Sequence, residues 1–95
     1  GVLEFAGNVI QGHVLTETDG KTKGKNRVRV RLLKDNTVVQ EVKTDSDGFY
    51  LFEGVPVGSY TIRAMDNKTS PESHLVRIQS GGSFEANRDF VLLKK

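Results

Sequence analysis

Few residues of this 95-residue chain have the types and spacing that chemistry requires. Asp45 and Asp47 stand two residues apart beside Gly48, and clustered carboxylates are the ligands that calcium prefers. The same pattern is typical of an Asx turn, in which the aspartate side chain accepts backbone N–H groups. We adopt the turn as the simpler interpretation and keep Asp45 and Asp47 as calcium candidates, with no other cofactor expected.

Catalysis is not predicted by any motif. The aspartates fall in predicted loops open to water, whereas general acid-base catalysis needs a shielded cleft. His13 and His74 lack the spacing of a zinc-binding HExxH helix, no serine lies in a nucleophile elbow, and the chain has no cysteine. We therefore predict that the chain is not an enzyme.

Three arginines form the most regular charged pattern. Arg27, Arg29 and Arg31 alternate with apolar residues, which predicts one strand face with guanidinium groups about 7 Å apart. Such a face could bind an anionic glycan or an acidic protein. It could also be a solvated face, balanced by Glu41 and Asp89 on neighbouring strands and protecting an exposed strand edge. The net charge of +2 is too small to predict nucleic-acid binding.

The elements that position these residues are strands, because apolar residues alternate with polar ones and no helical period occurs. Seven strands are predicted, at residues 8–15, 27–33, 37–44, 49–52, 59–64, 74–79 and 84–93. The polar stretch 16–26 is predicted to be an exposed loop. Short strands at this spacing predict an all-β, seven-stranded antiparallel Greek-key β-sandwich. Its predicted core is Ile10, Val14, Val28, Val30, Leu32, Val42, Phe52, Tyr60, Ile62, Val76, Ile78, Phe90 and Leu92.

A family resemblance lies in the centre of the chain. Residues 45–52 read DSDGFYLF, and residues 54–64 read GVPVGSYTIRA. The combination resembles the signature of carboxypeptidase regulatory-like domains. These belong with the transthyretin-like (prealbumin-like) sandwiches and are related to the B-type repeats of Gram-positive surface adhesins. Residues 10–14, IQGHV, also resemble the opening of that family, whereas residues 23–26, KGKN, replace its usual Pro-x-x-Gly.

Related adhesin domains join a first-strand lysine to a last-strand asparagine through an isopeptide bond, with help from an acid. Asn87 lies in the predicted last strand, but residues 8–15 contain no lysine. Ala64 stands where that family's pattern has glutamate. We therefore expect no such cross-link.

The length predicts a single module over residues 1–95, with its core at about residues 7–93. The chain is 36% hydrophobic and 27% charged, which is typical of a globular domain. It has no apolar run of the roughly 18 residues that span a bilayer, and residues 1–6 lack the regions of a signal peptide. We expect a module excised from a larger exported protein, with its export signal elsewhere and no membrane insertion.

These features favour a non-catalytic accessory or spacer module of a secreted or cell-surface multidomain protein. Its partners would be neighbouring domains of the same polypeptide. One alternative is a ligand-binding module that recognises a glycan or a protein through the arginine face or a loop end. A second alternative, implied by the resemblance, is a regulatory domain appended to a metallopeptidase.

Overall fold

The computed structural model describes residues 8–66, 68–81 and 84–93 and contains ten strand segments. None of the described residues belongs to a helix long and apolar enough to cross a membrane. The segments are β1 (Asn8–Thr18), β2 (Lys21–Gly24), β3 (Arg29–Lys34), β4 (Thr37–Lys43), β5 (Phe49–Glu53), β6 (Gly58–Met65), β7 (Thr69–Ser70), β8 (His74–Ile78), β9 (Phe84–Asn87) and β10 (Phe90–Leu92).

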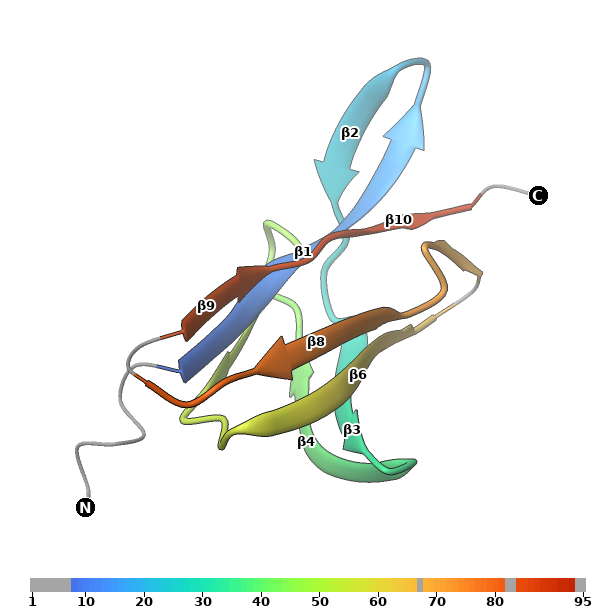
Figure 1. The fold of residues 1–95 in the computed structure, drawn as a ribbon. Coiled ribbons are helices and arrows are strands. Elements are labelled where there is room, and N and C mark those ends of the chain that lie inside the picture. The colour runs from blue at the N-terminus through green and yellow to red at the C-terminus, as the bar shows by residue number, and fades with distance from the viewer. Residues whose placement is uncertain (1–7, 67, 82–83, 94–95) are drawn as a thin grey trace.

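Two sheets pack against each other (Figure 1). One has the order β4-β3-β6-β8 and is antiparallel throughout. The other is built around β1, which pairs with β5 and β9 through its first half and with β2 and β10 through its second half. The predicted all-β, prealbumin-like sandwich is confirmed. Two details differ: β1 runs parallel to β9 and β10, and ten segments replace the predicted seven strands.

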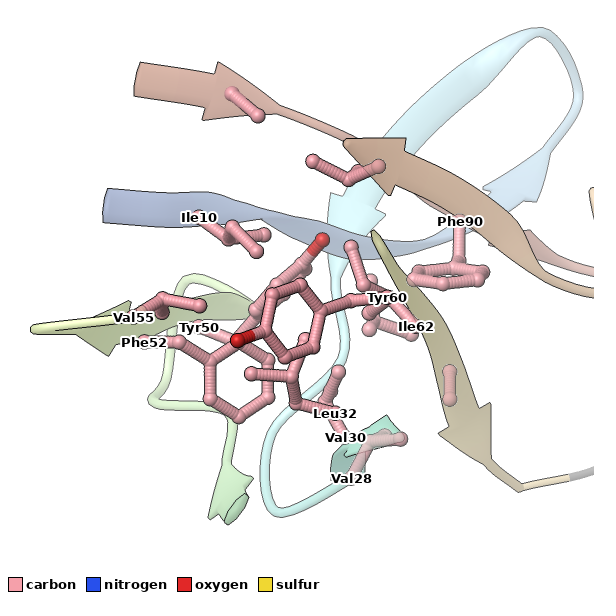
Figure 2. Close-up of a cluster of buried hydrophobic side chains, with 14 of the residues drawn as sticks. Ile10, Val28, Val30, Leu32, Tyr50, Phe52, Val55, Tyr60, Ile62 and Phe90 are labelled. Carbon is pink, nitrogen blue, oxygen red and sulfur yellow. The ribbon is translucent and has the colours of Figure 1, made fainter. Parts of the chain in front are cut away.

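The core lies between the sheets and is filled mainly by alternate residues of β1, β3, β5, β6 and β8 (Figure 2). Ile10 and Val14 of β1 are fully buried, and Figure 2 shows Ile10 on the opposite side of the core from Val30 and Leu32 of β3. Full burial of one such side chain stabilises the fold by about 2 kcal/mol. The predicted core is buried except for Val42 and Leu92, which are partly buried against it. The structure adds Tyr50, Val55, Ala64 and Ala86.

The predicted loop at residues 16–26 is largely a β-hairpin that projects from the sandwich (Figure 1). Strand β1 continues to Thr18, and β2 returns in antiparallel register with it. Asp19 and Gly20 between them have φ of 53° and 79°, the backbone of a tight two-residue hairpin turn. The prediction was wrong because exposed polar residues on both faces hide the alternation by which strands are recognised.

The predicted last strand, residues 84–93, is interrupted at Arg88 and Asp89. The Arg88 backbone N–H donates to the Gln11 carbonyl at 2.8 Å. Further along β1, the backbone N–H of His13 donates to Asp89 Oδ1 at 2.8 Å. A side-chain oxygen thus replaces a backbone carbonyl in the ladder, so β1 stays paired across the break.

Gly12 lies where this break passes over β1. A Cβ at position 12 would stand 1.6 Å from the Arg88 carbonyl oxygen and 2.9 Å from the Tyr50 hydroxyl oxygen. The same Tyr50 hydroxyl donates to the Arg88 carbonyl at 2.6 Å. Glycine is therefore required here by close backbone approach, because any side chain would displace the last strand.

We expect Gly12→Ala to destabilise the domain by about 3 kcal/mol or more, because its Cβ overlaps backbone that cannot move alone. Gly20→Ala is the control, since its Cβ meets nothing within 4 Å and only the positive φ costs about 1 kcal/mol. Urea unfolding measures both changes. An equal loss of stability in the two variants would contradict the close approach.

The ladder role of Asp89 predicts different outcomes for two substitutions. Asp89→Ala leaves the His13 N–H without its acceptor and should lower the free energy of unfolding by about 1 kcal/mol. Asp89→Asn keeps an acceptor oxygen and should lose less than half of that amount. Equal losses in urea unfolding would instead assign the stabilisation to the negative charge, which lies 3.7 Å from His13 Nδ1.

Candidate interaction surface

The side chains that point away from the core on the β4-β3-β6-β8 sheet form one surface, which we call the outer face. The cross-strand registers arrange these side chains in rows perpendicular to the strands. The outer face consists of Arg29, Arg31, Leu33, Val38, Glu41, Lys43, Ser59, Thr61, Arg63, Met65, Leu75 and Arg77.

The central row is charged and largely self-neutralised. Arg31 stands between Glu41 of β4 and Arg63 of β6. Its Nε donates to Glu41 Oε2 at 2.7 Å, and Arg63 Nη2 donates to Glu72 Oε1 at 2.9 Å. The hydrogen bond from Arg31, aided by the positive charges of Arg31, Arg29 and Lys43, lowers the pKa of Glu41 although slight desolvation opposes it. Exposed pairs of this kind add little stability.

Three further cations on the outer face have no ion pair with any described residue. Arg29 and Lys43 face each other across β3 and β4, and Arg77 stands opposite Ser59 at the other edge of the sheet. All three side chains are exposed. The outer face therefore carries five cationic groups against the carboxylates of Glu41 and Glu72, which leaves an excess of positive charge.

An apolar row crosses the same sheet and was not predicted from the sequence. Leu33 of β3 lies beside Val38 of β4 on one side and Thr61 of β6 on the other, and Leu75 of β8 follows Thr61. Leu75 is 80% exposed and Val38 is 44% exposed. A bulge opposite the Leu32–Leu33 step brings Val38 into register. The sequence pattern conceals such a row because its members come from four strands.

Arg27 does not belong to the predicted arginine row. It lies in a turn before β3, with φ of 61°, and its backbone N–H donates to the Thr44 carbonyl at 3.1 Å. The buried Thr44 side chain closes this turn by accepting from the Val28 N–H and donating to the Lys25 carbonyl. Arg29 and Arg31 share the outer face as predicted, whereas Arg27 precedes the paired strand.

Asp45 forms the turn that the sequence predicts. Its Oδ1 accepts the backbone N–H groups of Asp47 at 2.9 Å and Phe49 at 3.0 Å, which is the Asx-turn arrangement. The Gly48 N–H binds the Asp45 carbonyl, and Gly48 has φ of 78°. Among residues 8–66, 68–81 and 84–93, no three or more acids or histidines gather as a metal site would require.

Both histidines contact Asp89, which therefore lies beside β1 and does not balance the arginine face as predicted. His74 Nε2 lies 2.7 Å from the Asp89 carbonyl oxygen, and its ring packs edge-on against Phe90 with centroids 4.8 Å apart. His13 packs against Phe49. The His74 contact connects β8 of one sheet to the interrupted last strand of the other, so these histidines are explained by structural roles.

Solved structures with this fold include two pilins and a carbohydrate-binding candidate. GBS52, the minor pilin of Streptococcus agalactiae, has a TM-score of 0.67 at 12% identity, over 96% of this chain and 47% of that one. BcpA, the major pilin subunit of Bacillus cereus, has a TM-score of 0.58 at 11% identity, over 90% and 30% of the chains. A Pseudomonas aeruginosa structure described as a candidate carbohydrate-binding protein has a TM-score of 0.62 at 14% identity, over 90% of both chains.

At these identities the likeness shows the fold alone. The predicted relation to prealbumin-like sandwiches and Gram-positive surface adhesins is thus confirmed as a relation of fold. This chain spans less than half the length of either pilin. No curated protein matches the sequence.

A family model provides the more specific assignment. The model is described as the second beta sandwich domain of the NOMO1-like BOS complex subunit, and it matches residues 5–91 of the 95. This chain therefore belongs to the family of second β-sandwich domains of NOMO1-like BOS complex subunits.

Proposed function

We propose that this chain is a non-catalytic spacer module, which holds neighbouring domains of a larger polypeptide apart and transmits tension between them. The family description supports this proposal, because a second sandwich domain implies at least one other in the same chain. The pilins that share the fold support a secreted or cell-surface setting, which is part of the same proposal.

The observation that carries the proposal is the parallel pairing of the first and last strands. Asn8 at the start of β1 pairs with Phe84, and Thr16 further along β1 pairs with Leu92 at the end of β10. The described chain therefore enters at one end of β1 and leaves beside its other half (Figure 1). Eight residues of strand separate the two points, or about 26 Å. Domains attached there would be held apart along the long dimension of β1.

The same pairing determines how the module would respond to tension. A force on the two chain ends pulls β1 and β10 in opposite directions along their length, because the strands are parallel. The ladder hydrogen bonds from β1 to β9 and β10 are then loaded together in shear. Strands pulled apart from one end would instead lose these bonds one after another. Shear loading thus makes the fold resistant to extension along its own chain.

Single-molecule pulling tests this proposal. We expect the domain pulled through its two termini to unfold at a severalfold higher force than the same domain pulled through its N-terminus and Glu85→Cys. Glu85 pairs with Val9, so the second geometry peels β9 from β1. Because forced unfolding is governed by the unfolding rate, both geometries are compared at one loading rate. The chain has no natural cysteine that would compete for attachment.

Equal unfolding forces in the two geometries would show that the first and last strands do not form the mechanical clamp. The spacer proposal would then lose its principal support. A variant that weakens only the clamp provides a second check: Asp89→Ala should lower the force for the termini geometry more than for the peeling geometry.

The proposed module needs no calcium, because Asp45 Oδ1 already accepts the backbone N–H groups of Asp47 and Phe49. We expect millimolar calcium to leave the thermal midpoint unchanged. Asp45→Ala should cost about 1–2 kcal/mol because two backbone N–H groups lose their acceptor, whereas Asp47→Ala should change stability by less than about 0.5 kcal/mol. A calcium-dependent rise of the midpoint that both substitutions abolish would instead assign a calcium site to Asp45 and Asp47.

A further inference from the structure

We propose that the outer face docks a separate protein chain, and that this partner presents an acidic surface with an apolar ridge along it. The proposal is independent of the spacer role, since it concerns the sheet that does not contain β1. It rests on the apolar row, on the cations beside that row that have no ion pair with any described residue, and on the position of the chain ends.

The apolar row is exposed at both ends, at Val38 and Leu75, and half-buried in its middle, at Leu33 and Thr61. Val38, Leu33, Thr61 and Leu75 come from four adjacent strands, so the row extends about 14 Å at the usual strand spacing. Leu75 is the most exposed large apolar side chain among the described residues, at 80%. Single exposed apolar residues are ordinary, but a row that spans every strand of a sheet offers a continuous surface to a partner.

The charges beside the row determine the chemistry of the partner. Arg31 and Arg63 follow the row on one side and are paired with glutamates, whereas Arg77 lies on the other side without an ion pair to any described residue. Arg29 and Lys43 add two further exposed cations beyond Arg31. Carboxylates on a partner would be attracted to these groups. A second copy of this face would bring like charges together, which opposes self-association.

The position of the chain ends favours a separate chain as the partner. Asn8 and Leu92 belong to β1 and β10, which lie in the sheet on the opposite side of the core. Domains attached at these ends would adjoin the β1 sheet, and Figure 1 shows the β4-β3-β6-β8 sheet on the other side of the molecule. The outer face is thus left open for a protein that arrives from elsewhere.

A pair of synthetic helical peptides tests the proposal with the full 95-residue chain. Both peptides have one stripe of leucines, flanked by glutamates in the first and by lysines in the second. In ¹⁵N NMR titrations we expect saturable binding of the glutamate peptide, with amide shifts concentrated on β4, β3, β6 and β8. The lysine peptide should bind at least about tenfold more weakly, because its charges repel the outer face.

Matched variants distinguish binding at the outer face from nonspecific binding elsewhere on the surface. Leu75→Ser and Arg77→Glu should each weaken the glutamate peptide about tenfold. Val57→Ser and Lys21→Glu should leave its affinity unchanged, because Val57 is 51% exposed in the loop before β6 and Lys21 is exposed on β2, both outside the rows. All four side chains are exposed, so each variant should keep the parent's thermal midpoint.

Three results would overturn the proposal. One is equal affinity for the glutamate and lysine peptides. Another is saturable binding at this face of a sulfated heparin oligosaccharide but of neither peptide, which would assign the face to a glycan. The third is concentration-dependent dimerisation in sedimentation velocity that Leu75→Ser abolishes, which would assign the face to a second copy of this chain.

Discussion

The fold depends on the hydrogen bonds that strand β1 makes along both of its edges. One edge pairs with β5 and then β2, while the other pairs with β9 and then β10. Both edges change partner near His13 and Val14, where the ladder would otherwise be interrupted. The Val14 N–H binds the Gly48 carbonyl, and Asp89 supplies an oxygen to the His13 N–H. Since buried backbone groups must be paired, these two contacts allow one strand to serve four partners.

The sequence predicts the part of this fold that follows from alternation. Val30 and Leu32 point inward and Arg29 and Arg31 outward because successive side chains of a strand face opposite sides. It does not predict the parallel pairing of first and last strands, because register between distant segments has no local signal. The burial of Tyr50 also has no local signal, because it follows from the regular pairing of β5 with β1.

The candidate surface was predictable only in part. The spacing of Arg29 and Arg31 assigns them to one face. Arg27 has the same spacing and was therefore assigned to that face as well, because an arginine at this position does not predict a positive φ. The ion pair between Arg31 and Glu41 was anticipated as a balance of charge across neighbouring strands. The apolar row through Leu33 and Leu75 could not be recognised without the cross-strand register. That register depends in turn on the bulge in β4. A surface whose residues come from several strands therefore cannot be predicted from the sequence until the strand register is known.

The pairing of β1 with β9 and β10 also affects how the domain is made. Residues 8–16 cannot form this ladder until residues 84–92 have been synthesised. This edge of β1 therefore stays unpaired until almost the whole module has left the ribosome. The β4-β3-β6-β8 sheet draws on residues 29–78 only and can assemble earlier. Closure over so long a stretch of chain is slow, and an open strand edge accepts foreign strands in the meantime. In a polypeptide with consecutive sandwiches, the first strand of each nascent module is thus the position most exposed to exchange with its neighbour.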